Sequence, residues 1–370
     1  MRKGWEYKKL GDCTQILDSQ RKPVTKRDRK SGIYPYYGAT GIQDYVDKYI
    51  FDGRYVLVGE DGAKWSSFTQ SAFIIEGKTW VNNHAHVLRT NDFLVDSFLV
   101  YFLNYSDLDS YISGAIIRKL TQASLRNIDI PLPPKSTQLA IVSELDKINE
   151  LIRLKKEQLK DFDNLAQSLF YEMFGDPVEN EKGWEVKKLG EIAKSAIGLT
   201  YKPENVTEEL SGTVVLRSSN IQNSILDFND IVRVNVLVKE DKMVNDGDIL
   251  MCSRNGSFRL VGKVALIKGL KERMSYGAFM TIIRSPYNPY LFEYFKTPAF
   301  RQYLITGKTT TVNQITVKML NNLTLPLPPL SLQQLFAQRI EQIEREKSEV
   351  QKSIQDLETL LASRMQYWFE

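Results

Sequence analysis

Three residues in the first third of the chain have the types and spacing of a metal-dependent nuclease. Asp61, Glu76 and Lys78 form a D…ExK arrangement, in which carboxylates hold Mg²⁺ and the lysine supports the attacking water. Triplets of this kind often arise by chance, and Asp61-Gly62 is also an ordinary turn dipeptide. The second half of the chain has no counterpart. We therefore keep a Mg²⁺-dependent nuclease only as an alternative.

Other patterns that could support catalysis or metal binding are incomplete. His84 and His86 would share one face of a strand, but no further ligand types cluster near them in the sequence, so we expect polar contacts rather than a metal site. The Gly-Lys-Thr triplets at 77–79 and 307–309 lack the first glycine of a phosphate-binding loop. The Asn-Pro-Tyr triplet at 288–290 lacks the second proline expected of an amino-methyltransferase. We predict no catalytic residue, no metal and no cofactor bound by this chain.

Basic and amide side chains indicate binding to nucleic acid instead. Six of the residues in 21–30 are basic, and a stretch rich in Tyr and Gly follows at 34–41. Lysine and arginine neutralise phosphates, whereas arginine and asparagine can also bind the edges of guanine and adenine. A solvated loop would also explain the charge run, sheet packing would also explain Trp65 and Asn83, and we expect about half of the candidates to make no contact. The candidate DNA-binding residues are Lys22, Lys26, Arg27, Tyr37, Thr40, Lys64, Trp65, Asn83, His84, Arg118, Lys119, Thr121, Arg217, Ser218, Asn220, Arg254, Asn255, Ser257, Arg259, Lys308, Thr310 and Asn313.

These candidates lie inside an internal repeat. Residues 4–12 (GWEYKKLGD) recur as 183–191 (GWEVKKLGE), and residues 130–134 (IPLPP) recur as 325–329 (LPLPP). Each proline pair prevents helix formation, and Ser136 or Ser331 then stands where a helix N-cap is wanted. The regions between the repeated segments differ in sequence and length. Such a duplication predicts one frame that presents two different binding surfaces.

The segments after the proline pairs predict two long helices. Apolar residues recur there at alternating steps of three and four, which is the seam of a coiled coil, and no Gly or Pro interrupts them. The two seams would most simply bury each other, although two independent amphipathic helices would show the same periodicity. Lys155 and Lys347 interrupt the seams at positions that the repeat aligns with Val350 and Ile152. The seam residues are Leu145, Ile148, Ile152, Leu159, Phe162, Leu169, Ile340, Ile343, Val350, Ile354, Leu357 and Leu361.

The two variable regions predict a mixture of strands and helices. In the first region, β-branched and aromatic runs are broken by turn dipeptides and by Gly77. The predicted strands lie within 45–60, 72–89, 214–221, 247–254 and 261–268, with breaks at 52–53 and 61–62, and one helix is predicted over 93–108.

Composition narrows the class of protein. A chain of 370 residues predicts two or three domains, and its two cysteines, Cys13 and Cys252, give no disulfide framework. It has no run of 18 apolar residues and no apolar signal region, so we expect a cytoplasmic protein. Residues 136–174 and 331–370 each hold 5 basic and 7 acidic residues, a net charge of −2 each. Because the whole chain has a net charge of +4, the rest of the chain carries +8. This distribution predicts a polyanionic partner away from the helices.

The repeated heads, the two variable regions, the two proline-rich segments with their helices and the join MFGDP at 173–177 together resemble the specificity subunits of type I restriction–modification systems. The resemblance covers essentially the whole chain. It implies an α+β fold with two α/β target-recognition domains in tandem, each followed by a long helix, and the two helices pairing as an antiparallel coiled coil. The implied segments are a first domain at 1–134, a helix at 135–174, a linker at 175–182, a second domain at 183–329 and a helix at 330–370.

The resemblance also implies partners and a non-catalytic role. Each domain would read one half of a bipartite double-stranded DNA site. Two methyltransferase subunits would bind the helices, restriction subunits would join them, and S-adenosylmethionine, ATP and Mg²⁺ would belong to those partners. A coiled-coil adaptor that binds only proteins remains a further alternative.

Overall fold

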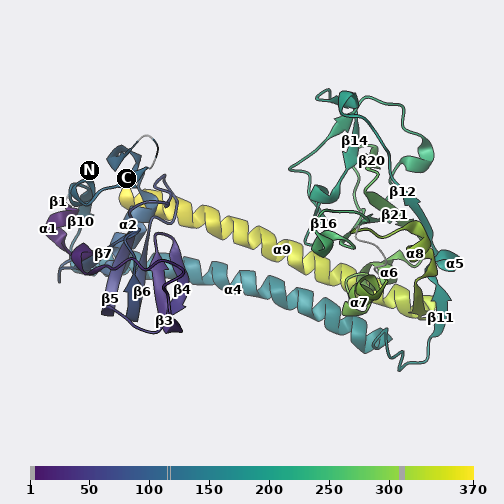
Figure 1. The fold of residues 1–370 in the computed structure, drawn as a ribbon, viewed down its shortest axis with the longest axis horizontal. Coiled ribbons are helices and arrows are strands. Elements are labelled where there is room, and N and C mark those ends of the chain that lie inside the picture. The colour runs from purple at the N-terminus through teal and green to yellow at the C-terminus, as the bar shows by residue number, and fades with distance from the viewer. Residues whose placement is uncertain (1–4, 115, 117, 308–312) are drawn as a thin grey trace. The chain divides into compact units, whose positions relative to one another are not determined.

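The computed structural model describes residues 5–114, 116, 118–307 and 313–370 and divides the chain into two compact units. The first unit contains residues 1–158 and 350–370, and the second contains residues 159–349. Figure 1 shows that each unit holds a mixed α/β domain and parts of two long helices. The mixed α and β class and the tandem order of the domains are therefore confirmed.

The first unit is built on a six-stranded sheet of order β2-β7-β5-β6-β3-β4. Its core lies between this sheet and helix α2, where Val56, Val58 and Leu88 pack against Phe98 and Leu103. The sheet strands are β2 (Thr14–Ile16), β3 (Ser31–Gly38), β4 (Gly41–Val46), β5 (Phe51–Gly59), β6 (Ala72–Val81) and β7 (Ala85–Thr90). The smaller elements are β1 (Glu6–Lys9), α1 (Leu10–Cys13), α2 (Asp96–Tyr105), β8 (Ile112–Ser113), β9 (Lys119–Leu120), α3 (Gln122–Arg126) and β10 (Asp129–Leu132).

Two glycines that were expected to end strands lie inside them. Gly53 and Gly77 pair with each other across β5 and β6, and both have positive φ angles, of 141° and 78°. Without a Cβ, the chain takes this conformation and the ladder continues past it. The predicted breaks at 52–53 and at Gly77 are therefore wrong, because the turn residues bend the strands without ending them.

The second unit contains two four-stranded sheets, of order β12-β21-β18-β19 and β13-β17-β14-β20. The strands of the first sheet are β12 (Lys194–Ile197), β18 (Ile249–Cys252), β19 (Val264–Leu266) and β21 (Met280–Arg284), and those of the second are β13 (Val206–Thr207), β14 (Thr213–Leu216), β17 (Arg233–Val234) and β20 (Met274–Tyr276). The remaining elements are β11 (Glu185–Lys188), α5 (Leu189–Ile192), β15 (Ile221–Gln222), β16 (Ile225–Leu226), α6 (Asn288–Tyr294), α7 (Pro298–Thr306), α8 (Val317–Asn322) and β22 (Thr324–Leu327).

The strand predicted over 214–221 is only half formed. β14 ends at Leu216, and a 3₁₀ turn follows at Ser218–Asn220. The buried Asn220 side chain accepts from the amide of Arg217 and donates to the carbonyls of Asp227 and Asp230. These bonds replace a strand ladder, because a short amide side chain competes with the backbone for hydrogen bonds.

The same four-stranded arrangement occurs separately in each of the two units. The sheet order β2-β7-β5-β6 of the first unit is repeated as β12-β21-β18-β19 in the second. In both units the head segment forms an antiparallel ladder with the proline-rich segment, as β1 with β10 and as β11 with β22. The internal repeat of the sequence therefore corresponds to a repeat of the fold.

Each proline-rich segment leads into a 40-residue helix, α4 (Lys135–Phe174) or α9 (Leu330–Phe369). Ser136 and Ser331 lie inside the first turns and not at the N-cap positions expected for them. Two buried glutamines hold the segments instead: Gln138 donates to the carbonyl of Pro133 (2.9 Å), and Gln333 donates to that of Pro328 (2.6 Å). The two helices therefore begin with the same hydrogen bond between a glutamine of the helix and the proline-rich segment before it.

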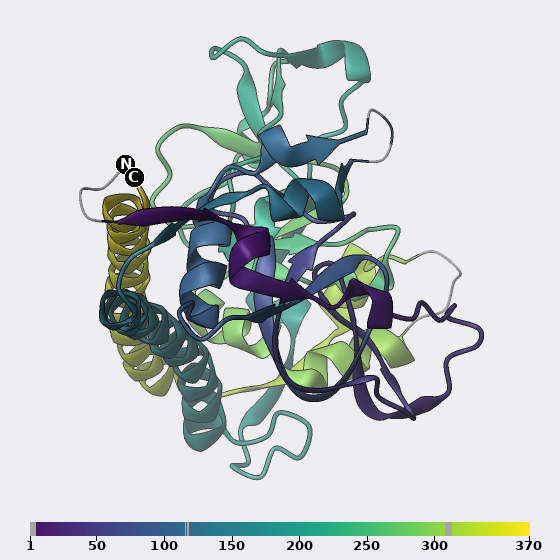
Figure 2. The ribbon, with the colours of Figure 1, turned by 90° about the vertical axis from the view of Figure 1, so that its left-hand side faces the viewer.

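Helices α4 and α9 pair in opposite directions within each unit. In the first unit, Glu144 contacts Arg364 and Lys156 lies 2.7 Å from Glu358. In the second unit, Asp163 lies 2.8 Å from Lys347. All twelve seam residues are buried or half-buried, and Figure 2 shows the two helices side by side. The antiparallel pairing is therefore confirmed, and none of the helices in the described parts of the chain is long and apolar enough to cross a membrane.

Candidate nucleic-acid interface

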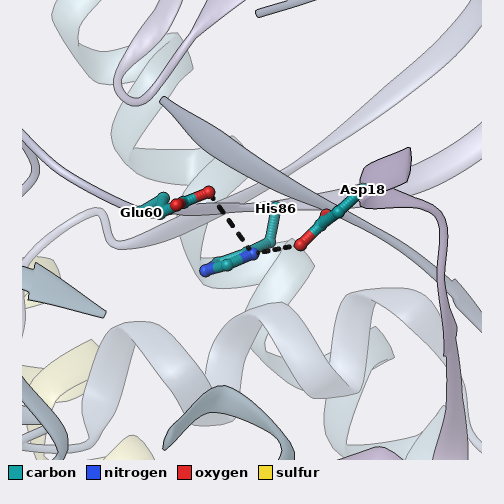
Figure 3. A group of neighbouring side chains, drawn as sticks. All are labelled: Asp18, Glu60 and His86. Atoms are coloured by element: carbon teal, nitrogen blue, oxygen red, sulfur yellow. Dashed lines mark hydrogen bonds and ion pairs between the residues drawn. The ribbon is translucent and has the colours of Figure 1, made fainter. Parts of the chain in front are cut away.

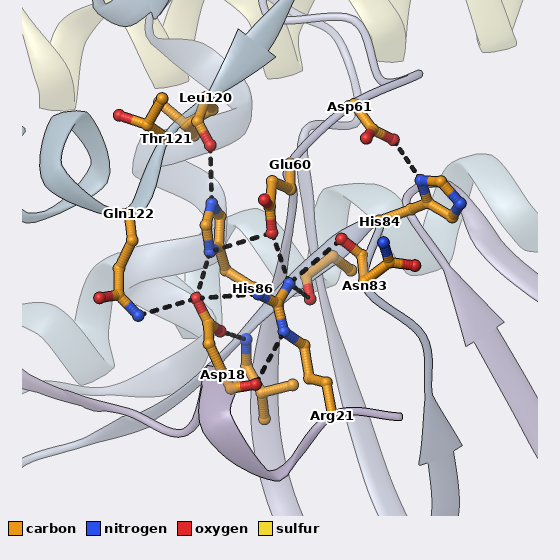
Figure 4. A network of polar contacts seen from close by, with 12 residues as sticks. Asp18, Arg21, Glu60, Asp61, Asn83, His84, His86, Leu120, Thr121 and Gln122 are labelled. Atoms are coloured by element: carbon orange, nitrogen blue, oxygen red, sulfur yellow. Dashed lines mark hydrogen bonds and ion pairs between the residues drawn. The ribbon is translucent and has the colours of Figure 1, made fainter. Parts of the chain in front are cut away.

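In the first unit, three segments meet at one end of the sheet (Figure 4). The chain leaves β5 through Glu60 and Asp61, turns between β6 and β7 at Asn83 and His84, and returns in β9. The Glu60 amide donates to the His84 carbonyl (2.8 Å), and the Leu120 amide donates to the Glu60 carbonyl (2.8 Å). We call this place the first strand-end surface: Asp61, Asn83, His84 and Lys119.

A buried ionic network lies under the first strand-end surface. The Nδ1 of His86 is 2.6 Å from an Asp18 carboxylate oxygen, and its Nε2 is 2.8 Å from the carbonyl of Leu120. The Glu60 carboxylate lies 2.5 Å from the guanidinium of Arg21 and 2.6 Å from the ammonium of Lys119. Figure 3 shows how Asp18 and Glu60 approach the imidazole from two sides. Both imidazole nitrogens face oxygen atoms, one of a carboxylate and one of a backbone carbonyl.

The sequence expectation that no ligand types gather near the histidine pair is wrong for His86. Asp18 and Glu60, which are distant in sequence, bring carboxylate oxygens within 4.8 Å of its ring, a spacing that could hold a metal ion. However, Arg21 also lies 3.4 Å from Asp18, so two cations already neutralise the carboxylates. A metal ion would be repelled by these groups, and the donor set therefore fits an ion-pair network better than a metal centre.

The network makes the stability of the first unit depend on pH. Burial raises the pKa of Asp18, but hydrogen bonds from His86 and the Val87 amide outweigh it, so this pKa lies below its ordinary value of 3.8. Burial also raises the pKa of Glu60, but bonds from Lys119 and Arg21 bring it below its ordinary value of 4.5. Because both pKa values are lowered by folding, this stabilisation is complete above the ordinary values and is lost as the pH falls through the lowered ones.

We expect Glu60→Gln to remove much of this acid sensitivity. The variant removes one of the two carboxylates beside Arg21 and the carboxylate beside Lys119, and it should lower the free energy of unfolding by about 3 kcal/mol at pH 7, as for other broken buried pairs. Urea unfolding at pH 7 and at pH 3.5 measures the difference. The control is Glu76→Gln, whose 74% exposed side chain pairs with Arg54. An unchanged pH dependence in Glu60→Gln would contradict the role of the network.

The second unit has a matching surface at the end of β18. The Ser253 amide donates to the Phe279 carbonyl (2.9 Å), and the Ile315 amide donates to the Ser253 carbonyl (2.7 Å). Arg254 pairs through its backbone with Gln314, as Asp61 does with Lys119. We call Arg254, Phe279 and Gln314 the second strand-end surface. Beside it, the Asn255 side chain donates to the Ser218 hydroxyl (3.1 Å).

The structure brings some of the first unit's candidates together and separates others. Lys22, Thr40, Lys64, Asn83, His84 and Lys119 are at least partly exposed and lie on or next to the turns at this end of the sheet. Lys26 and Arg27 are exposed in a turn beside β3 and β4, and Arg118 pairs with Asp109. The other three have structural partners: Trp65 is 4% exposed and donates to the Gly59 carbonyl, Tyr37 packs on Phe73, and Thr121 caps α3.

The candidates of the second unit divide in the same way. Arg254, Asn255, Ser257 and Ser218 lie around the second strand-end surface, and the Asn313 side chain donates to the Gly256 carbonyl there. Arg217 pairs with Asp230, and Arg259 lines a cavity beside α7. Asn220 is 1% exposed and holds its turn, so its predicted contact with nucleic acid conflicts with its burial. Lys308 and Thr310 lie outside the described residues.

The residues of the nuclease alternative do not form a site. Asp61 contacts His84 (2.5 Å), whereas Glu76 contacts Arg54 and Lys78 lies over the ring of Tyr49. Ala72 of β6 pairs with Val58, near the end of β5 that leads to Asp61, and Glu76 lies four residues further along β6, roughly 13 Å at the rise of a strand. The two carboxylates therefore do not converge on one metal ion, because they lie towards different parts of the sheet.

Sequence reasoning missed Phe279 and Gln314 and weighed Asp61 only as a turn or a metal ligand. No motif marks these positions. The signal that finds them is the equivalence of the two strand ends, which becomes visible only when the hydrogen bonds of both units are compared.

The fold defines a class of protein: a duplicated α/β chain in which the same frame carries two surfaces with different side chains. The chain belongs to the family of type I restriction modification DNA specificity domains, whose model matches residues 2–161 and 181–359. This membership confirms the resemblance in the sequence.

Several relatives are named as specificity subunits of type I restriction enzymes. A type I restriction enzyme specificity subunit of Methanocaldococcus jannaschii, MjaVIII, is 23% identical over 96% of this chain and 92% of its own length. A putative specificity subunit of Haemophilus influenzae is 41% identical, but the match covers 40% of this chain and 38% of that protein. The EcoKI specificity subunit of Escherichia coli is 25% identical over 72% of this chain and 62% of its own length.

Solved structures share the fold. An S subunit of a type I restriction–modification system from M. genitalium has a TM-score of 0.56 and 13% identity over 98% of this chain and 95% of that chain. A chain from a type I R-M system assembly has a TM-score of 0.62 and 19% identity over 100% of this chain and 98% of that chain.

Proposed function

We propose that this chain is the DNA-specificity subunit of a type I restriction–modification system and that each unit reads one half of a bipartite site. The observation that carries the proposal is the repetition of one backbone frame with different side chains at the two strand-end surfaces. A protein that recognises two different DNA sequences needs both features. The common backbone frame positions the side chains, and the different side chains determine which bases are bound.

The proposal assigns the chemistry to partner subunits. Two methyltransferase subunits bind the helices, and restriction subunits complete the complex with S-adenosylmethionine, ATP and Mg²⁺. The first unit supports a protein partner on α4, where Leu139 and Leu151 are 51% and 47% exposed and line one groove. Exposed leucines along an otherwise charged helix are typical of a protein-binding face.

The test is the methylation pattern that the chain specifies. We expect that co-expression with its cognate methyltransferase subunit, in a host without DNA methylation, gives a methylated motif with two specified halves separated by unspecified bases. Long-read sequencing measures the motif. The control is the methyltransferase without this chain, which should give no motif.

Two other outcomes would overturn the proposal. One is a motif that is identical with and without the chain. The other is metal-dependent cleavage of DNA by the purified chain, which would favour the nuclease alternative. Binding to a defined duplex that survives competitor DNA and weakens with salt would exclude a purely protein-binding adaptor, because phosphate contacts release counterions.

A further inference from the structure

The two strand-end surfaces hold their side chains at equivalent backbone positions. Matching hydrogen bonds align Glu60 with Ser253 and His84 with Phe279, so Asp61 aligns with Arg254 one residue later. The isolated bridges then align Lys119 with Gln314. The sequence does not show these equivalences, because the segments that contain them differ in length.

At these positions, each unit carries a pair of side chains in mutual contact at the surface, of which Asp61 is half-buried and the other three are exposed. In the first unit, Nδ1 of His84 lies 2.5 Å from a carboxylate oxygen of Asp61. In the second, the guanidinium of Arg254 lies over the ring of Phe279, 5.1 Å from its centre. The imidazole is 47% exposed and the phenyl ring 57% exposed. One frame therefore presents a carboxylate with an imidazole in one unit and a guanidinium with an aromatic ring in the other.

The residues under the pairs differ as well. The first pair lies above the ionic network of Asp18, Glu60 and His86, whereas the second lies above two neutral hydroxyls, with Thr281 donating to Ser253 (3.0 Å). Both supports are buried, so the backbone beneath each pair is fixed by a different set of bonds. Rigid support of this kind limits the directions in which the exposed side chains can point.

We propose that these two pairs determine sequence specificity: Arg254 with Phe279 selects a guanine in the half-site of the second unit, and Asp61 with His84 selects a base with an amino group in the major groove, cytosine or adenine, in the half-site of the first. This inference rests on the proposed function and deepens it by naming the discriminating residues. Arginine donates two hydrogen bonds to O6 and N7 of guanine, and a carboxylate accepts from the amino group of a base. His84 orients the Asp61 carboxylate, and Phe279 orients the guanidinium of Arg254.

Structural explanations account less well for the pairs. A single polar contact near the surface, such as that of His84 with Asp61, contributes little to stability, as does an exposed cation–π contact. The contact within each pair also differs completely between the two units, although the backbone is the same. If these side chains only held the turns in place, the same two residues could have served in both units.

The experiment compares methylated motifs for Arg254→Ala and Asp61→Ala in the full chain, co-expressed with the cognate methyltransferase. Arg254→Ala should lower the preference for guanine at one position of one half-site by roughly 10- to 100-fold and leave the other half-site unchanged. Asp61→Ala should relax one position of the opposite half-site by a similar factor. Arg254→Gln should shift the preference at the same position from guanine towards adenine.

Matched controls separate specificity from charge and from folding. Arg273→Ala removes an exposed arginine of the second unit that pairs with Glu240, and Glu76→Ala removes an exposed acid of the first. Both should leave the motif unchanged. Thermal unfolding of each purified variant verifies that the units remain folded, and the half-site that is not altered serves as an internal check in the same cells.

The outcomes distinguish this inference from the proposed function. If the unmodified chain specifies no bipartite motif, the proposed function fails. If it specifies one and Arg254→Ala and Asp61→Ala leave both halves unchanged, the function stands and the inference is wrong. If Arg254→Ala weakens methylation at every site without changing any base preference, Arg254 contacts a phosphate and the inference is also wrong.

Discussion

Replacing Phe336 with alanine is expected to lower the free energy of unfolding of the second unit by about 3–5 kcal/mol, the range for removing a buried phenyl ring. Phe336 is fully buried, and its ring centre lies 6.0 Å from that of Phe170 and 4.9 Å from that of Phe174. It belongs to a cluster in which both helices meet Tyr290 of α6. The cavity would therefore weaken the attachment of both helices to this domain.

The neighbouring Leu335 provides the control for this prediction. Its side chain is 42% exposed on the same helix, so Leu335→Ala should change the free energy of unfolding by less than about 1 kcal/mol. Chemical denaturation, followed by circular dichroism, compares the two variants. Equal losses of stability would show that the ring cluster does not hold the helices to the domain.

Removing residues 361–370 is expected to unfold the first unit or to leave it only marginally stable. Met365 is 7% exposed in the core of this unit, and Phe369 contacts the rings of Phe98 and Tyr105 of α2. Glu144 of α4 would also lose Arg364 and Trp368. Each buried side chain that is lost costs about 2–5 kcal/mol, and a domain of this size is stable by only about 5–15 kcal/mol.

The second unit serves as an internal control for the truncation, because residues 361–370 lie outside it. Hydrogen exchange with mass spectrometry should show lost protection in β5, β6 and β7 and unchanged protection in β18 and β21. A milder variant, Phe369→Ala, should reduce protection of the first unit in the same strands. Full protection of β5 to β7 in the truncated chain would show that the stability of the first unit does not depend on residues 361–370.

The frame could be predicted from sequence because its signals are local. The two proline pairs, the repeated GWE-x-KKLG heads and the heptad steps each determine structure within a few residues of themselves. They indicated the tandem order and the paired helices correctly. The N-cap expectation for Ser136 and Ser331 failed because Gln138 and Gln333 hold the proline-rich segments from inside the helices.

The candidate site could be predicted only in part, because it is made by contacts between residues distant in sequence. The polar residues indicated the basic loop and the candidate contacts Asn83 and His84, but not that Asp18 lies against His86, 68 residues later. It also did not separate Trp65, which is buried, from Lys64, which is exposed. The alignment of Asp61 with Arg254 follows from hydrogen bonds between strands, and no single segment contains that information.

The return of α9 to the first unit has a consequence for biosynthesis. Residues 350–370 complete the core around Phe98, yet the ribosome makes them only after all of 159–349. At 5–20 residues per second, the first unit waits roughly 10 to 40 seconds for its last core residues. The second unit, in contrast, is contiguous and can fold as it emerges. A nascent chain that stops early thus keeps an open, apolar face on its N-terminal domain, and cellular quality control can recognise the product as unfinished.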